Sequence, residues 1–146
     1  MQQATSVSDL SIANRTLVMG IVNVTEDSFS DGGRWLDFDA AINHARELVA
    51  QGADMIDVGG ESTRPGSVRV PVDEEMARVV PVTRELARQG AVISVDTMRA
   101  ETAERAVRAG AACVNDVSGG LADENMYRVM AETKLPVCLM HWRAER

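Results

Sequence analysis

Short runs of β-branched and other apolar residues alternate with longer helical patterns along the 146 residues of the chain. The strand-like runs cover residues 16–23, 54–59, 91–96, 112–117 and 136–141, and a helical pattern follows each of the first four. This alternation is typical of βα units arranged around a parallel sheet. We therefore predict a single α/β domain over residues 1–146, with about five parallel strands and four helices.

Three Gly-Ala pairs mark the predicted helix ends, at Gly52-Ala53, Gly90-Ala91 and Gly110-Ala111. A glycine just past a helix adopts the left-handed conformation that ends it, so each following strand starts within two or three residues. The connections after the strands are longer, with about fifteen residues at 24–38 and about thirteen at 60–72. Because the long loops lie on one side only, we expect the functional site on that side.

Apolar periodicity describes two of the helices in more detail. The first, at about residues 39–51, is expected to have its N-cap at Asp37 or Asp39. Its predicted buried face consists of Ala41, Ile42, Ala45, Leu48 and Val49. The second, at about residues 73–89, is expected to bury Met76, Val79, Val80 and Leu86. Pro81 falls inside this pattern and predicts a kink or break, because proline lacks a backbone amide.

The charge balance argues against polyanionic partners. Lysines and arginines number 15 against 22 acidic residues, the net charge is −7, and no basic block interrupts the acidic excess. We therefore expect no nucleic acid and no anionic membrane as a partner. Cys113 and Cys138 lie in apolar runs without a CxxC spacing, which predicts small core residues of a reducing compartment. Since no export signal and no apolar run of ~20 residues is present, we expect a cytoplasmic protein.

Polar residues stand where the predicted strands end: Asn23, Gly59-Gly60-Glu61, Asp96, Asn115-Asp116 and His141. The carboxyl ends of parallel strands meet at one edge, where both open α/β sheets and (β/α)₈ barrels bind their ligands. In the fourth strand Asp116 must point to the face opposite Asn115. We therefore expect Asn115 to belong to the site and Asp116 to be structural.

The length of the chain leaves two architectures open. Five strands in 146 residues suit an open flavodoxin-like sheet, whereas a (β/α)₈ barrel takes about 250 residues and eight strands. Length alone favours the open sheet. Neither GxGxxG nor GxxxxGK[ST] occurs in the sequence, however, so both glycine fingerprints of nucleotide-binding sheets are absent.

Four segments in order resemble the dihydropteroate synthase family: VMGIVNVTEDSFSDGG (18–33), IDVGGESTRPG (56–66), ISVDTMRAETAERAVRAGAACVNDVSGG (93–120) and PVCLMHWR (136–143). The resemblance covers residues 17–143 and is strongest to the actinobacterial type. It implies a (β/α)₈ TIM barrel, of which these residues form an N-terminal, partial barrel. It also implies a transferase of folate biosynthesis that condenses (7,8-dihydropterin-6-yl)methyl diphosphate with 4-aminobenzoate, with Mg²⁺ bound. The products are dihydropteroate and diphosphate, and full-length members are expected to be homodimers.

The resemblance assigns three residues at strand ends to the pterin and the metal ion. Asp96 would accept paired N–H bonds from the aminopyrimidine edge of the pterin, although an aspartate in this position can also cap the next helix. Asn115 would be the second pterin contact, since its amide both donates and accepts. Asn23 would ligate Mg²⁺, which prefers oxygen ligands, although the sequence alone favours a turn residue there.

The two long loops would supply the remaining contacts. By the same resemblance, Thr63 would lie near the diphosphate or the pterin, and Arg64 near the anionic oxygens. The alternative is a Pro-Gly turn with an exposed arginine. Asp31 would stabilise positive charge at the pterin methylene, while Phe29 packs against the aromatic amine. For His141 a place in the site and simple packing at the rim remain equally open.

Three family features are not found in these residues: a later pterin-pocket aspartate, a lysine that contacts both substrates and an Arg-x-His segment that holds diphosphate. We therefore expect the isolated chain to be incomplete for catalysis. Two other functions remain open, a non-catalytic pterin-binding half-barrel and a pterin-dependent methyltransferase domain. The intact loops TEDSFSDGG and ESTRPG favour the synthase over the methyltransferase.

Overall fold

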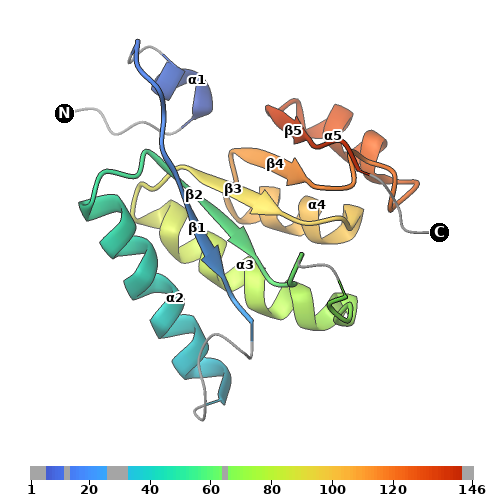
Figure 1. Ribbon diagram of the computed structural model, residues 1–146, viewed down its shortest axis with the longest axis horizontal. Coiled ribbons are helices and arrows are strands. Elements are labelled where there is room, and N and C mark those ends of the chain that lie inside the picture. Colours follow the sequence, from blue (N-terminus) through green and yellow to red (C-terminus); the bar gives the residue numbers. More distant parts are fainter. Residues whose placement is uncertain (1–5, 12–13, 26–32, 64–65, 143–146) are drawn as a thin grey trace.

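Five parallel strands form one sheet in which neighbours in space are also neighbours in the chain (Figure 1). The computed structural model describes residues 6–11, 14–25, 33–63 and 66–142. The strands are β1 (Met19–Asn23), β2 (Met55–Gly59), β3 (Ile93–Asp96), β4 (Cys113–Asp116) and β5 (Val137–Leu139). Each strand lies inside the run predicted for it, so the prediction of five parallel strands is confirmed.

Four helices cover one face of this sheet. They are α2 (Gly33–Ala50), α3 (Val72–Arg88), α4 (Ala100–Ala109) and α5 (Met126–Thr133), while the short α1 (Val7–Ser11) lies near the amino end of β1 (Figure 1). Each of α2 to α5 contacts the next helix in the chain, which requires them to share a face. Consecutive strand order with helices on one face is typical of a (β/α)₈ barrel, whereas a flavodoxin-like sheet changes its order and carries helices on both faces. The chain is therefore a partial barrel, and the open sheet favoured by length is wrong.

Side chains alternate between an outer face, which meets the helices, and an inner face on the other side. A Cβ added at Gly20 would lie 2.9 Å from Leu48 Cδ1 of α2, so Gly20 belongs to the outer face. By alternation Asn23 belongs to the inner face. The register continues this assignment across the sheet along one row: Asn23, Gly59, Asp96, Asn115 and Cys138.

The hydrophobic core lies between the outer face and the helices. Fully or almost fully buried β-branched residues come from the strands and alanines from the helices: Val22, Ile56, Val58, Ile93, Val95, Val114, Ala41, Ala45, Ala103 and Ala106. Each buried valine or isoleucine stabilises the fold by roughly 1.5–3 kcal/mol. Because alanine is small, the helices can approach the branched strand residues closely, and the core holds the strand ends in a fixed register.

The three predicted helix stops are confirmed. Gly52, Gly90 and Gly110 have φ angles of 111°, 90° and 119°, in the left-handed region that disfavours other residues. In each case the amide of the following alanine donates a hydrogen bond to the carbonyl five residues earlier: Ala53 to Leu48, Ala91 to Leu86 and Ala111 to Ala106. The repeated motif explains why each next strand begins so soon.

The first long helix begins earlier than predicted. Because α2 starts at Gly33, Asp37 and Asp39 lie inside it, and neither is its N-cap. The connection after β1 is correspondingly shorter than residues 24–38. Val49, expected in the buried face, is 47% exposed. No helix in the described part of the chain is long and apolar enough to cross a membrane.

Of the kink or break predicted at Pro81, the break does not occur, because α3 continues from Val72 to Arg88. Pro81 lies on the exposed side of the helix, where water can satisfy the carbonyl that loses its partner. The buried side is anchored by Val79 and Leu86, as predicted, whereas Met76 and Val80 are only partly buried. Other residues of α3 complete the buried side: Glu75, Val82 and Thr83.

Candidate functional site

The inner face carries polar side chains at the carboxyl ends of the first four strands. Asn23, Gly59, Asp96 and Asn115 are in register on β1 to β4. A Cβ added at Gly59 would lie 3.4 Å from Asp96 Oδ2 and 3.5 Å from Asn23 Oδ1. The side chains of Asn23 and Asp96 therefore converge above Gly59, which leaves room between them. The structure thus brings together three of the predicted site residues, Asn23, Asp96 and Asn115.

Asn115 is held by a carboxylate that sequence reasoning missed. Its Nδ2 atom lies 3.2 Å from Asp57 Oδ2 and 3.3 Å from Asp57 Oδ1, and donates across the intervening strand β3. Asp57 is only 3% exposed. The signal was present in the sequence, because Asp57 stands two positions before Gly59 and so shares its face. This hydrogen bond fixes which way the Asn115 amide points, with its oxygen left to face a ligand.

Burial, together with the negative charges of Asp57, Glu75, Asp116 and Glu61, raises the pKa of Asp96 to about 7. Burial likewise raises the pKa of Asp57, although hydrogen bonds from its neighbours oppose the shift. A group poised near neutrality in this way is typical of a functional site. A ligand that donates N–H groups to Asp96 would favour the ionised carboxylate, so binding and ionisation are linked.

Asp116 lies on the outer face, as predicted, and has a structural role. One of its oxygens accepts hydrogen bonds from the Ser118 amide (2.8 Å) and hydroxyl (2.7 Å), and the other from the Gly120 amide (2.9 Å). Asp116 therefore shapes the turn after β4. Asp96 does not cap α4, because the Ala100 amide donates to Asp123 Oδ2 instead (2.8 Å).

The connection between β2 and α3 starts beside the row of polar residues. Thr63 is exposed on it. Arg64 lies outside the described residues, and so do Asp31 and Phe29 of the first loop, so their predicted roles stay predictions. The start of the connection is held by a residue of α3, because Arg78 Nη1 donates to the Gly60 carbonyl at 3.1 Å.

Asn23 fits the part of a magnesium ligand. Its side chain is exposed at the strand end, and its Oδ1 atom faces the space above Gly59 that Asp96 Oδ2 also borders. Hard cations such as Mg²⁺ prefer amide and carboxylate oxygens and keep several waters. No group of three or more His, Cys, Asp or Glu side chains that could enclose a metal ion occurs among the described residues. Asn23 is the described residue that could hold such an ion, together with water and ligand oxygens.

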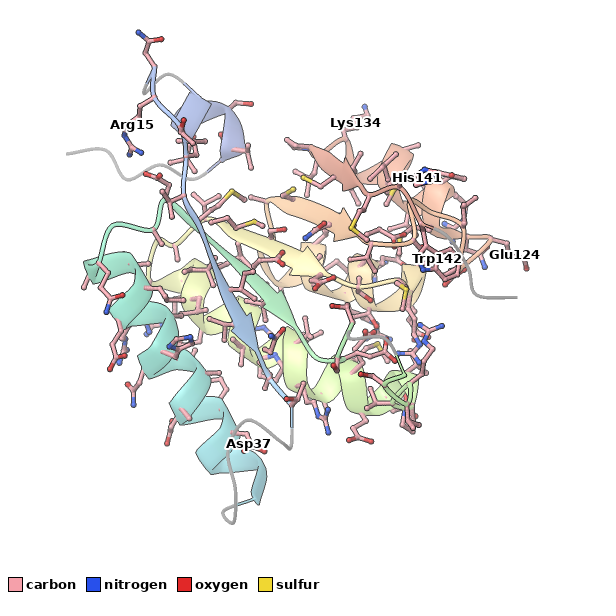
Figure 2. All side chains as sticks on the ribbon, viewed as in Figure 1. Arg15, Asp37, Glu124, Lys134, His141 and Trp142 are labelled. Atoms are coloured by element: carbon pink, nitrogen blue, oxygen red, sulfur yellow. The ribbon has the colours of Figure 1, made fainter. Side chains whose placement is uncertain are left out.

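The far edge of the sheet is more open than the sequence suggested. Cys138 on β5 is exposed, so the prediction that both cysteines are core residues is confirmed only for Cys113. Strand β5 pairs with β4 alone in the described part of the chain, which explains why its side chains are accessible. His141 is exposed and lies beside β5 and α5, far across the sheet from Asp37 at the start of α2 (Figure 2).

A separate hollow of about 1000 Å³ lies on the helical side, between α2 and α3. Phe38, Pro81 and Arg84 are among its lining residues, and none of Asn23, Gly59, Asp96 or Asn115 borders it. Polar groups that converge at strand ends are the usual sign of a site in this architecture. The inner face therefore remains the better candidate.

Residues 19–146 match the model of a family described as pterin binding enzyme. The chain is similar to the dihydropteroate synthase of Mycobacterium leprae, with 54% identity over 126 residues that make up 86% of this chain and 44% of that protein. It is 52% identical to that of Bacillus subtilis over 143 residues, 97% of this chain and 50% of that protein. A crystal structure of a dihydropteroate synthase from Clostridium difficile with pteroic acid matches with a TM-score of 0.85 and 50% identity, over 89% of this chain and 50% of that one. The chain spans about half the length of the curated relatives it matches.

Proposed function

The chain belongs to the family of pterin-binding enzymes, and on that premise we propose that it forms part of a dihydropteroate synthase of folate biosynthesis. The reaction is a substitution at the methylene carbon of (7,8-dihydropterin-6-yl)methyl diphosphate. The bond from this carbon to the diphosphate oxygen breaks, the nitrogen of 4-aminobenzoate bonds to the same carbon, and the amine loses a proton. Two relatives named dihydropteroate synthase, which are 54% and 52% identical to this chain over the matched residues, support the proposal.

One observation carries the proposal: Asp96 and Asn115 stand in register on neighbouring strands and face the same side. A pterin presents N–H donors and ring acceptors along one edge, which is the pattern that a carboxylate beside an amide can match. Asp57 orients the Asn115 amide for this contact. The raised pKa of Asp96 fits a carboxylate that becomes fully ionised when a donor pair binds.

The leaving diphosphate is placed at the Asn23 side of the row. Asn23 would hold a Mg²⁺ ion there, and the ion would supply positive charge to the diphosphate oxygens. Thr63 and Arg64 follow β2 in the chain. The resemblance to the family assigns Arg64 to the anionic oxygens and Thr63 to the diphosphate or the pterin, and we assign Thr63 to the diphosphate end. An arginine in that position matches phosphate oxygens with a planar pair of donors. The pterin therefore lies along the row, with its methylene carbon toward β1.

The first loop is assigned to the amine and the cationic carbon. If the carbon–oxygen bond breaks early, positive charge develops on the pterin methylene, and a carboxylate nearby lowers the barrier. We assign Asp31 to this charge and Phe29 to contact with 4-aminobenzoate. No covalent bond to the protein is required.

The wider setting follows from the same proposal. The substrates are small molecules, and the net charge of −7 supports the absence of nucleic acid and anionic membrane partners. Two free cysteines support a reducing compartment, the cytoplasm. The resemblance to the family supports a homodimer of the full-length protein.

The direct test is synthesis by the full-length protein that carries this chain. Dihydropteroate is measured by mass spectrometry after mixing both substrates with Mg²⁺, with a chelator, and with one substrate omitted. We expect product only when both substrates and Mg²⁺ are present, and a loss of turnover in Asp31→Asn without loss of pteroic acid affinity. Binding of pteroic acid without any synthesis would favour a non-catalytic pterin-binding protein instead.

A further inference from the structure

We propose that Arg99 is a positioning residue that holds the connection between β2 and α3 at the anionic end of the site. It acts through Glu61, the first residue of that connection after the glycines. The inference rests on the proposed function, which assigns Thr63 of this connection to substrate. Arg99 itself is assigned no contact with substrate. Its role is to keep the connection after β2 and the connection after β3 in a fixed geometry relative to each other.

Glu61 closes the connection on itself. Its Oε1 atom accepts hydrogen bonds from the Val70 amide at 3.1 Å and from Arg69 Nε at 3.2 Å. Glu61 is only 6% exposed, although it stands at the rim of the sheet. One carboxylate therefore ties the two ends of the connection that carries Thr63.

Arg99 ties this loop to the next connection. Its Nη1 atom lies 3.6 Å from Glu61 Oε2 and 3.5 Å from Glu75 Oε1, and its Nη2 atom donates to the Val70 carbonyl at 2.5 Å. The guanidinium thus reaches the start of the loop, its end and helix α3. Arg99 itself lies between β3 and α4, three residues after Asp96.

Glu75 anchors the arrangement from α3. It is fully buried, and its carboxylate accepts hydrogen bonds from Thr97 Oγ1 at 3.0 Å and from Thr102 Oγ1 at 2.5 Å. A buried carboxylate is costly unless it is paired and hydrogen-bonded, and here both conditions are met. The Thr97 hydroxyl also accepts the Arg99 amide at 3.1 Å, which fixes the arginine backbone.

These contacts couple the two ends of the site. The segment from Asp96 to Arg99 carries the pterin-binding carboxylate at one end and the guanidinium that holds the Thr63 loop at the other. Buried ion pairs add little stability compared with apolar packing of the same volume. We therefore assign the cluster of Glu61, Arg99 and Glu75 to geometry: it sets the distance between the pterin edge and the diphosphate end.

The test compares Arg99→Met and Arg99→Lys with Arg108→Met in the full-length protein. Arg108 is a matched control, since it is a largely exposed arginine of α4 that pairs with Glu104. Exchange of the Val70 amide, measured by NMR, reports directly on the loop closure. Titration calorimetry then measures the affinity for inorganic diphosphate with Mg²⁺ and, separately, for pteroic acid.

In Arg99→Met we expect faster exchange of the Val70 amide and weaker diphosphate binding by roughly one to two orders of magnitude, with pteroic acid affinity within about twofold of the parent. Arg99→Lys keeps the charge and should recover part of both losses, and Arg108→Met should change neither. If Arg99→Met does not fold, Arg99→Lys decides, because it lacks the second nitrogen that reaches Val70 and must still weaken diphosphate binding. Unchanged diphosphate affinity in a folded variant would overturn the inference. A parent protein that binds neither diphosphate nor pteroic acid would instead overturn the proposed function.

Discussion

The side-chain amide of Asn115 donates to the buried carboxylate of Asp57, at 3.2 Å, although the two residues lie on β4 and β2 with a strand between them. The contact joins residues 58 positions apart in the chain. It places a second carboxylate beneath the Asp96 and Asn115 pair, where it both orients the amide and disfavours the charge on Asp96. Asp57 therefore helps to set both the orientation of the Asn115 amide and the pKa of Asp96.

Replacing Asp57 by Asn should lower the pKa of Asp96 below its wild-type value of about 7, because one of the negative charges that raises it is removed. The titration of the Asp96 carboxyl carbon by NMR measures this shift. Asp39→Asn, an exposed change on α2, serves as the control and should leave the titration as it is. An equal pKa in the parent and Asp57→Asn would show that the charge of Asp57 does not contribute to the raised pKa of Asp96.

Replacing Asp96 by Asn should stabilise the fold at pH 8. The folded pKa of Asp96 is raised above its unfolded value of 3.8, so its contribution to stability falls as the pH rises from about 4 to about 7. Since one pKa unit corresponds to about 1.4 kcal/mol and the group is partly accessible, the gain should be on the order of 2 kcal/mol at pH 8 and near zero at pH 4. Urea unfolding at both pH values measures it.

Asp54→Asn provides a control of opposite sign for that experiment. A hydrogen bond from Arg15 lowers the pKa of Asp54 from 3.8 to about 2. The ionised Asp54 therefore stabilises the fold at neutral pH, and this stabilisation is lost as the pH falls from 3.8 to about 2. The variant should be less stable than the parent at pH 8. A gain in stability at pH 8 from both Asp96→Asn and Asp54→Asn would contradict the opposite pKa shifts assigned to these two residues.

Gly59, the last residue of β2, and Gly60, which follows it, should respond differently to alanine. At Gly60 a Cβ would lie 2.9 Å from Val79 Cγ2 and 3.1 Å from the Glu75 carbonyl oxygen, so Gly60→Ala should lower the free energy of unfolding by roughly 1–3 kcal/mol. At Gly59 the new methyl group meets only ordinary contacts with Asp96 and Asn23. Gly59→Ala should fold normally but bind pteroic acid at least about tenfold more weakly. Urea unfolding and titration calorimetry separate the two effects, and equal stability losses would refute the assigned faces.

Asn23→Ala should weaken the binding of diphosphate only when Mg²⁺ is present. Removal of a metal ligand should cost at least about tenfold in Mg²⁺-dependent affinity, whereas the exposed position predicts a stability change within about 0.5 kcal/mol. Titration calorimetry with Mg²⁺ and with a chelator makes the comparison. A similar loss under both conditions would remove Asn23 from the metal site.

Features set by local chemistry could be predicted from the sequence. The strands follow their β-branched runs, the helices stop at Gly52, Gly90 and Gly110, and alternation correctly separated Asn115 from Asp116. These features depend on backbone conformation and on a period of two residues, which a single sequence displays. The same reasoning placed Asn23, Asp96 and Asn115 at one edge.

Features set by distant packing could not be predicted in this way. The break expected at Pro81 does not occur, because buried side chains on the opposite side hold α3 together. Nothing in the sequence singles out Glu75 and Arg99, and only the folded structure shows that Glu75 is fully buried and paired with Arg99. Cys138 was expected in the core, but its exposure depends on what pairs with β5.

Pterin binding at Asp96 is tested most directly by the titration of the Asp96 carboxyl carbon in the full-length protein, with and without saturating pteroic acid. If the pterin edge donates N–H groups to Asp96, the ligand favours the ionised carboxylate, and the pKa should fall from about 7 toward or below the ordinary aspartate value. A pKa that stays near 7 in the saturated complex would show that the pterin does not bind at Asp96, and would contradict the proposed site.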